Sequence, residues 1–157
     1  MITLIDDQLL DELCAAAAAS PRRRKNHNFH QTDDHPAHRL LNAMQPDSYI
    51  PPHRHLDPNK DETFVVLRGL LGLLVFDDAG NVAKAVKIGA GEAAAGVDIP
   101  HGTWHTAIAL QPDTVFLEAK SGPYLPFTAA ERAPWAPAES AAEATAYLTK
   151  LKGHILG

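Results

Sequence analysis

The first twenty residues have the pattern of an amphipathic helix. Its apolar residues recur at helical spacing and form one stripe: they are Leu9, Leu10, Leu13 and Cys14. The alanine run 15–19 strongly favours a helix, Asp6 or Asp7 can cap its beginning, and Ser20-Pro21 ends it. We therefore expect a helix that ends near Ala19 and packs by one face, with Cys14 used for packing rather than chemistry.

From residue 24 onward the pattern changes to short runs of strand-forming residues separated by turn residues. The expected strands are residues 24–30, 39–44, 49–53, 62–68, 71–76, 82–88, 94–99, 104–110 and 114–120. The segment 77–81, Asp-Asp-Ala-Gly-Asn, is a hairpin turn signal between two of them. Many short strands at this spacing predict an all-β sandwich or barrel.

The pattern changes again after Gly122-Pro123. Residues 123–138 contain four prolines, which predicts an extended arm that crosses the surface of the barrel or of a partner subunit. From Glu139 to about Lys152 the residues favour a final helix. The side chains expected to face inward from this helix are Ala142, Ala146, and Leu148 or Leu151. We expect one domain over residues 1–157: a helix in 1–21, a β-barrel core in 22–122, and the arm with its helix in 123–157.

Composition and charge limit the function classes. The chain has 157 residues, is 45% hydrophobic and carries a net charge of −5, which argues against a general nucleic-acid binder. The basic run 22–25 is short, and we interpret it as a solvated loop or strand edge. The single cysteine excludes an intramolecular disulfide and suits a reducing compartment. With no membrane-length apolar segment and no basic leader, we expect a cytoplasmic protein without membrane contact.

Two short segments together supply three imidazoles and one carboxylate. His53 and His55 lie two residues apart, so on a strand both side chains point to one face. Glu62 opens the next strand, and His105 follows the tight turn at residues 100–102. Nitrogen and carboxylate donors of this kind hold divalent transition metals. The other histidines have no convincing ligand spacing and are expected at the surface or in hydrogen bonds: His27, His35, His38, His101 and His154.

This two-part arrangement resembles the cupin superfamily. The first cupin motif is glycine, five residues, His-x-His, a short spacer, glutamate, six residues and glycine. Its ligand and closing positions match His53, His55, Glu62 and Gly69, whereas its leading glycine falls at Asp47. In the second motif Pro100, Gly102 and His105 match, whereas the leading glycine falls at Ala94 and the closing asparagine at Ala109. The resemblance implies a cupin double-stranded β-helix, a jelly-roll barrel, with His53, His55, Glu62 and His105 as ligands of one metal ion.

A narrower resemblance covers nearly the whole chain. Residues 5–10, 22–30, 39–43, 52–55, 64–69, 102–105, 122–124 and 135–139 are similar to the WbuC-type cupin-fold metalloproteins. That family is associated with bacterial surface-polysaccharide gene clusters, so the resemblance implies a carbohydrate or a carbohydrate-derived substrate. Cupins are commonly dimers, which implies a homodimer.

Strand alternation suggests which polar side chains could line the barrel. The candidates for a substrate pocket are Arg24, Asn28, His30, Asn42, Glu118, Lys120 and Tyr124. If the faces that carry them point inward, they form a polar pocket for a sugar or a small acid. If these faces point outward, they are ordinary solvated surface, and Tyr124 after Gly-Pro is a packing anchor.

The expected metal ligands leave one or two coordination positions open, and they accept Fe, Mn, Ni, Co or Zn. An ion with an open position can act as a Lewis acid, which favours an isomerase or epimerase in polysaccharide metabolism. Two alternatives stay open: an Fe(II)-dependent dioxygenase, and a non-catalytic, metal-containing ligand-binding module. No residue is assigned as the catalytic acid or base from the sequence.

Overall fold

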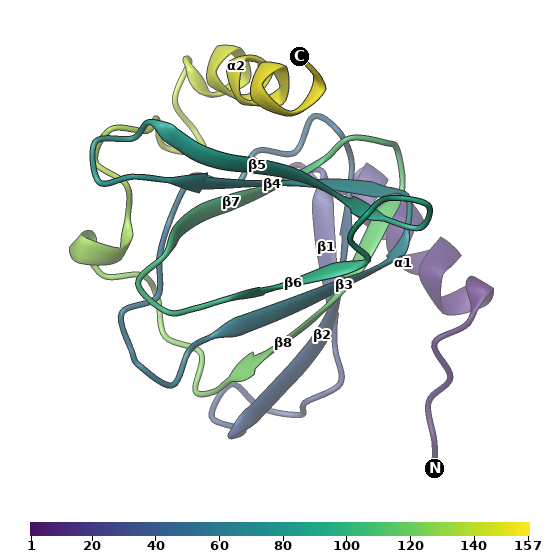
Figure 1. Cartoon of the computed structure of the whole chain (residues 1–157). Helices are drawn as coiled ribbons and strands as arrows, with labels where there is room; N and C mark the ends of the chain where they lie inside the picture. The colour runs from purple at the N-terminus through teal and green to yellow at the C-terminus, as the bar shows by residue number, and fades with distance from the viewer.

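The computed structural model describes residues 1–157 and consists mainly of two antiparallel β-sheets that face each other (Figure 1). The strands are β1 (Arg24–Asn28), β2 (Ala37–Met44), β3 (Glu62–Arg68), β4 (Leu70–Phe76), β5 (Val82–Gly89), β6 (Gly96–Ile99), β7 (Trp104–Ala109) and β8 (Thr114–Ser121). One sheet has the order β1-β2-β8-β3-β6 and the other the order β5-β4-β7. The expected all-β jelly-roll fold with a helix at each end is confirmed.

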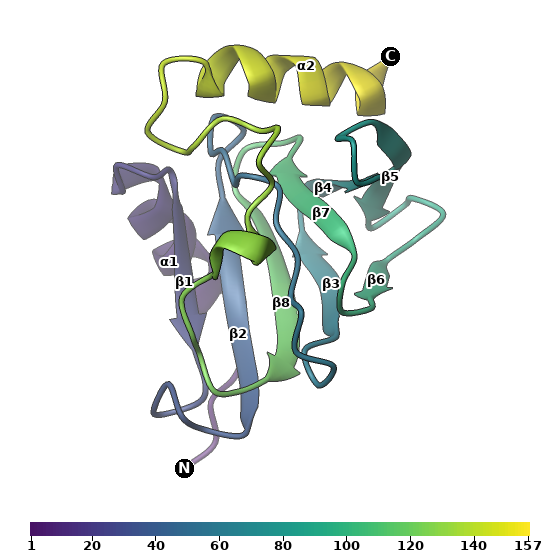
Figure 2. The same ribbon diagram turned by 90° about the vertical axis from the view of Figure 1, so that its left-hand side faces the viewer.

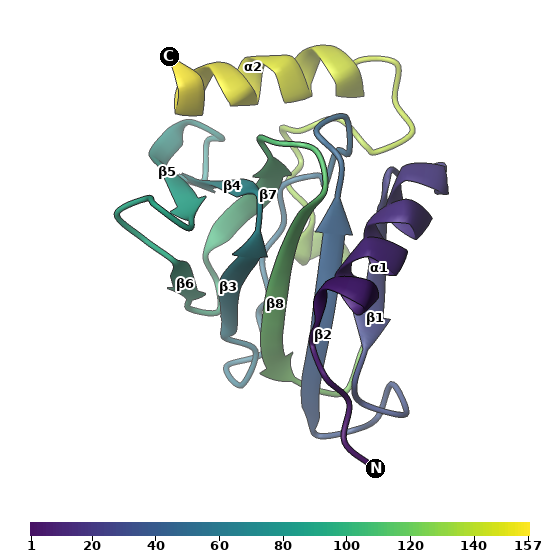
Figure 3. The same cartoon turned by 90° about the vertical axis from the view of Figure 1, so that its right-hand side faces the viewer.

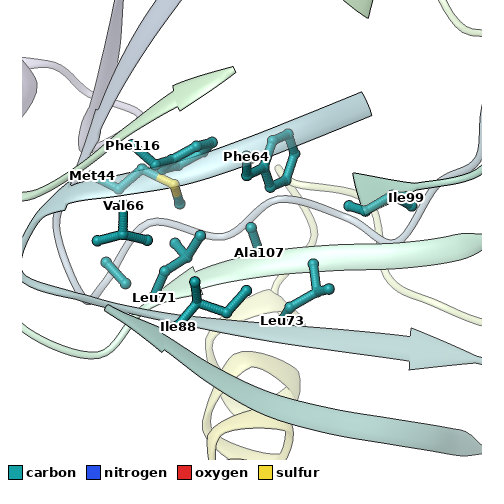
Figure 4. Close-up of a cluster of buried hydrophobic side chains, with 10 residues drawn as sticks. Met44, Phe64, Val66, Leu71, Leu73, Ile88, Ile99, Ala107 and Phe116 are labelled. Carbon is teal, nitrogen blue, oxygen red and sulfur yellow. The ribbon is translucent and has the colours of Figure 1, made fainter. Parts of the chain in front are cut away.

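Side-chain alternation packs the inner faces of the two sheets. Along β3, Glu62, Phe64 and Val66 are buried, whereas Val65 and Leu67 are exposed. The inner core contains residues of both sheets (Figure 4), namely Met44, Phe64, Val66, Leu71, Leu73, Ile88, Ile99, Ala107, Ala109 and Phe116. These apolar side chains fill one part of the space between the sheets, which leaves the polar inward-facing residues to line the rest.

A helix covers the outer face of each sheet. Helix α1 (Asp7–Ala19) begins at Asp6, whose carboxylate accepts a hydrogen bond from the Leu9 N–H at 3.0 Å. The helix lies against β1 and β2 (Figure 3). Its buried residues form a cluster with residues of β2 and β8: Leu10, Leu13, Cys14, Ala17, Leu41, Ala43 and Val115. Helix α2 (Ala144–Leu156) packs in the same way on β4 and β7 through Ala144, Leu148 and Leu151. No helix of the structure is both long and apolar enough to cross a membrane.

The expected strand over residues 49–53 is wrong. Only His53 pairs there, in isolated bridges with His105 and Arg132. Pro51 and Pro52 lack the N–H that a ladder needs. The carbonyl of Ile50 instead accepts a hydrogen bond from the Thr106 hydroxyl at 2.6 Å. The segment is therefore extended without belonging to a sheet.

The final helix begins later than expected, at Ala144 instead of Glu139. Residues 139–143 form turns, and Glu139 is bound by two arginines of the N-terminal half, at distances of 2.8–2.9 Å. The buried side chains also differ in part from the expected ones. Ala142 and Ala146 are exposed, contrary to expectation, whereas Leu148 and Leu151 are both buried.

Two glycines of the cupin-like motifs occupy turns that need a left-handed backbone. Gly69 joins β3 to β4 with φ +76°, and Gly102 has φ +78° in the turn before β7. A side chain would be strained at either angle. The turn at Gly102 leads directly into β7, which carries His105, whereas the turn at Gly69 connects the two sheets at the end of β3 opposite to Glu62.

The proline-rich arm crosses the end of the molecule where the sheets are farthest apart (Figures 1 and 2). It contains the short 3-10 helix η1 (Ala129–Glu131). The Arg54 N–H donates to the Glu131 carbonyl at 3.0 Å, and the Leu56 N–H donates to the Glu131 carboxylate at 3.1 Å. The arm is thus fastened to the segment that carries His53 and His55.

Candidate metal centre and cavity

Three separate segments bring the four expected metal ligands together. His53 and His55 lie in the extended segment before β3, Glu62 is the first residue of β3, and His105 lies in β7. The backbones of His53 and His105 exchange two hydrogen bonds, of 3.1 and 3.0 Å. This exchange fixes the extended segment against the three-stranded sheet, whereas Glu62 reaches the same place from the five-stranded sheet.

The side chains converge on the carboxylate of Glu62. One ligand atom from each of His53, His55 and Glu62 lies within 4.8 Å of the others. The His55 Nε2 atom is 3.1 Å from Glu62 Oε1, and the His105 Nε2 atom is 2.9 Å from Glu62 Oε2. The structure therefore brings His53, His55 and Glu62 together as a possible cation site, and it places His105 against the other oxygen of the same carboxylate.

The surroundings orient two of the imidazole rings. The Nδ1 atom of His53 lies 3.0 Å from the Pro51 carbonyl oxygen, and that of His105 lies 2.9 Å from the Thr103 carbonyl oxygen. A carbonyl accepts a proton at Nδ1, which leaves a lone pair at Nε2, as in many metal sites. His55 Nε2, Glu62 Oε2 and His105 Nε2 are buried and have no polar partner outside this cluster. Buried polar atoms without partners are costly, and a divalent cation would satisfy them.

The pKa values favour the protonation states that a metal needs. His53 is half-buried beside the cavity. This burial and the neighbouring His105 lower the pKa of His53 to about 3. Burial raises the pKa of Glu62, but the contacts with His105 and His55 and the charge of Lys120 outweigh it, so that this pKa lies well below its ordinary value. Neutral imidazole and ionised carboxylate are the ligand forms of these residues.

A cavity of about 420 Å³ opens beside the four residues. All seven side chains expected to form a substrate pocket line it: Arg24, Asn28, His30, Asn42, Glu118, Lys120 and Tyr124. Phe64 and Phe116 form part of its apolar floor. The volume lies within the range of small-molecule sites, which combine an apolar wall with a few polar groups.

Lys120 joins two carboxylates in the cavity wall. Its ammonium nitrogen lies 2.8 Å from Glu118 Oε1 and 3.4 Å from Glu62 Oε1. Burial opposes the charge of Lys120, but Glu118 and Glu62 raise its pKa to about 12. Burial and the charge of Glu62 raise the pKa of Glu118, whose other oxygen accepts a hydrogen bond of 2.7 Å from the Asn42 amide. Lys120 thus lies near two carboxylates. Glu62 is one of the four expected metal ligands, and Glu118 is not.

Several cavity residues were not among the sequence candidates, and three of them make notable contacts or extend the pattern. The ring of Phe127 lies over His53 and His55, with centroid distances of 4.6 and 5.4 Å. His38 stacks on His30 with centroids 3.9 Å apart, and Arg22 also lines the cavity. Alternation from Arg24 could have indicated Arg22. No local signal marks Phe127, because its position depends on the path of the arm.

Two sequence comparisons relate the chain to known proteins. A family model described as "Domain of unknown function (DUF6016)" matches residues 5–88. No curated protein sequence matches the chain.

Among solved structures, KdgF from Halomonas sp. is 19% identical, with a TM-score of 0.50 over 68% of this chain and 85% of that one. A conserved protein of unknown function from Streptococcus pyogenes is 12% identical, with a TM-score of 0.50 over 68% of this chain and 80% of that one. A cupin-2 domain containing protein from Shewanella frigidimarina is 18% identical, with a TM-score of 0.46 over 62% and 80%. The likeness to the first two structures, at a TM-score of 0.50, supports the two-sheet jelly-roll fold described above, and the WbuC subtype stays a prediction.

Proposed function

The chain belongs to the DUF6016 family, and we propose that it is a metal-dependent enzyme that isomerises or epimerises a carbohydrate or carbohydrate-derived small molecule. One observation carries this proposal. The carboxylate of Glu118 faces the same cavity as the cluster of three imidazoles and Glu62, and it is held there by Lys120 and Asn42. A proton acceptor and a cation site in one cavity are the two parts that such a reaction needs.

His53, His55, Glu62 and His105 would hold the ion: the buried ligand atoms of His55, Glu62 and His105 have no partner outside the cluster, and His53 lies within 4.8 Å of His55 and Glu62. A divalent transition metal, of which Fe, Mn, Ni, Co and Zn all accept these ligands, would act as a Lewis acid and polarise a carbonyl or hydroxyl oxygen of the substrate. The rings of His53 and His105 are pre-oriented by backbone carbonyls, so that little rearrangement is needed on binding.

Glu118 would move the proton. In an isomerisation or epimerisation, the C–H bond next to a carbonyl breaks, and the carboxylate of Glu118 takes the proton. In an isomerisation the same group then returns the proton to the neighbouring carbon, while the proton of the adjacent hydroxyl passes to the carbonyl oxygen. In an epimerisation water delivers a proton to the opposite face of the first carbon, and Glu118 releases its own proton to the solvent. No oxidant or reductant is consumed. Lys120 and Asn42 keep the carboxylate in position, because each contacts one of its oxygens.

The polar wall supports a hydroxylated substrate. The amides of Asn26 and Asn28 and the guanidinium of Arg24 line the cavity beside the ligand cluster, and such groups hydrogen-bond to sugar hydroxyls. A place in surface-polysaccharide metabolism follows from the WbuC-type resemblance. That role, the cytoplasmic location and the homodimer stay predictions.

The first test is metal content by elemental mass spectrometry on protein purified without added metal. We expect near-stoichiometric metal in the natural chain and none in a His53→Ala/His105→Ala double variant. The second test follows deuterium uptake from D₂O by proton NMR in a panel of keto sugars, aldoses and uronic acids. Glu118→Gln should abolish the uptake and keep the metal. Glu92→Gln, which removes an exposed carboxylate, should change neither.

Other outcomes would contradict the proposal. Absence of metal even after reconstitution would exclude a metalloenzyme. Bound iron with oxygen consumption and no deuterium uptake would identify the dioxygenase instead. Tight binding of a sugar without exchange or turnover would identify a non-catalytic module.

A further inference from the structure

The basic run Arg22-Arg23-Arg24-Lys25 is not simply a solvated strand edge. Arg23 has φ +57° and turns away to Asp47, with its Nε atom 3.0 Å from that carboxylate. Arg22 and Arg24, on the other side of the backbone, both line the cavity that contains the histidine cluster. The expectation for this run is therefore wrong for Arg24, whose side chain is largely buried, whereas Arg22 borders the cavity and stays exposed.

Arg24 is fixed by one end of its guanidinium. Its side chain is 16% exposed, and its Nη1 atom donates to Ser48 Oγ at 3.3 Å, the Tyr49 carbonyl at 3.2 Å and Glu139 Oε1 at 2.8 Å. All three bonds use the same nitrogen. The Nε and Nη2 atoms have no acceptor in the protein, so they keep donors for a molecule in the cavity.

Arg22 shares the same acidic partner. Its Nε and Nη2 atoms each lie 2.9 Å from a different oxygen of Glu139, which leaves Nη1 without a partner. Two guanidinium groups therefore share one carboxylate. This arrangement holds the pKa of Glu139 at about 2, through its hydrogen bonds with Arg22 and Arg24 against the effect of burial.

The corner around these arginines has an excess of positive charge. A neighbouring hollow of about 190 Å³ is lined only by polar residues, and Lys25 joins Arg22 and Arg24 there. Three cations thus line this hollow, and no carboxylate belongs to its wall, in a chain whose net charge is −5. A local potential opposite in sign to the whole molecule attracts anions to that place.

We propose that Arg22 and Arg24 form a subsite for an anionic group of the substrate, a phosphate or a carboxylate. The planar fork of a guanidinium suits both groups, because each offers two oxygens in one plane. Glu139 holds the two side chains in place and competes with the anion. That the remainder of the substrate binds at the histidine cluster rests on the proposed function. The anion subsite itself can be tested independently of that function.

The test uses inorganic phosphate, acetate and neutral glucose as probes. Dissociation constants are measured at low ionic strength by ¹H–¹⁵N NMR titration of the full chain and of the His53→Ala/His105→Ala variant, which removes phosphate binding to a metal. We expect at least one of the two anions to bind both proteins and to shift the signals of residues 22–26, and glucose to bind more weakly. The preferred anion identifies the chemical group. Because neither metal nor turnover is needed, a failure of the enzyme proposal leaves this result intact.

The variants separate binding from structure. Arg24→Gln and Arg22→Gln should each weaken anion binding about tenfold, the value of a charged hydrogen bond. Arg23→Gln changes the charge of the same run equally, yet it should leave binding within about twofold because Arg23 faces Asp47. Glu139→Gln should tighten binding by about threefold or more, since it removes the competing carboxylate.

A purely structural role for Arg24 predicts no gain in Glu139→Gln. Equal anion binding by Arg22→Gln, Arg23→Gln and the natural chain would overturn the proposal, as would absence of binding in both the natural chain and Glu139→Gln. If Arg24→Gln fails to fold, as judged by circular dichroism, Arg22→Gln and Glu139→Gln decide, because the side chain of Arg22 is 63% exposed.

Discussion

Lys120 offers a direct test of the electrostatics in the cavity, and its replacement by methionine keeps the length of the side chain while removing the charge. At an effective dielectric constant of about 20, unit charges 2.8 and 3.4 Å apart attract by about 6 and 5 kcal/mol. Desolvation of an ammonium that is only 18% exposed offsets much of this attraction. Removing one partner of a buried ion pair costs about 3–5 kcal/mol, and we expect a loss of that size in Lys120→Met.

The assay is urea unfolding of metal-stripped protein, with the exposed Lys87→Met on β5 as a matched control. A loss of about 3–5 kcal/mol corresponds to a fall in Tm of about 6–20 °C for a chain of this size. Without Lys120, Glu118 can escape its charge by protonation, because its pKa is already raised. The folded variant then holds a proton that the unfolded chain releases above about pH 4.5, so the loss should be larger at pH 8 than at pH 5. Stability within about 0.5 kcal/mol of the natural chain at pH 8 would refute this reasoning.

Three further predictions concern packing, pH and the arm. Leu148→Ala removes a buried contact of α2 and should cost about 2–5 kcal/mol in urea unfolding, whereas the exposed neighbour Thr149→Ala should cost far less. The pKa of His53 is about 3 when folded and 6.5 in an ordinary setting, so the unfolded chain takes up a proton first, and the stability of metal-stripped protein should fall as pH falls from about 6.5 to about 3. His53→Gln should flatten this part of the stability profile, and an unchanged slope would contradict the assignment. Phe127→Ala should speed release of a loaded metal to a chelator about tenfold, since the ring covers His53 and His55, yet lower the free energy of unfolding by no more than about 1 kcal/mol because Phe127 is 37% exposed.

Local pattern was sufficient to predict most of the secondary structure. Eight of the nine expected strands are present with bounds within two residues, and α1 begins and ends where its cap and Ser20-Pro21 indicate. The ninth, over residues 49–53, has the composition of a strand but contains two prolines that cannot donate to a ladder. The start of α2 depends on Glu139, which binds arginines more than a hundred residues away. The spacing of apolar residues and their helix propensity give no information about this long-range contact.

The inward face of a strand is harder to predict when both faces are apolar. In β3, Phe64 and Val66 point to the core while Val65 and Leu67 are exposed, and hydrophobicity alone does not separate the two pairs. The cupin-like motif indicates which face of β3 points inward. Glu62 is an expected metal ligand, and Phe64, two residues further along the strand, lies on the same face. The same alternation in β8 carries Glu118 and Lys120 inward beside Phe116. Phe127 could not be predicted in this way, since no periodic element contains it.

The candidate ligands come from both sheets and from the extended segment between them. Glu62 belongs to the five-stranded sheet and His105 to the three-stranded sheet, which share no ladder hydrogen bonds. An ion held at this point would cross-link the two sheets at the open end of the sandwich. Separation of the sheets and loss of the ion would then be one event, and slow amide exchange in β3 would be linked to slow exchange in β7. Metal occupancy would thereby control the rate at which the cavity opens, and with it the rates of ligand binding and release.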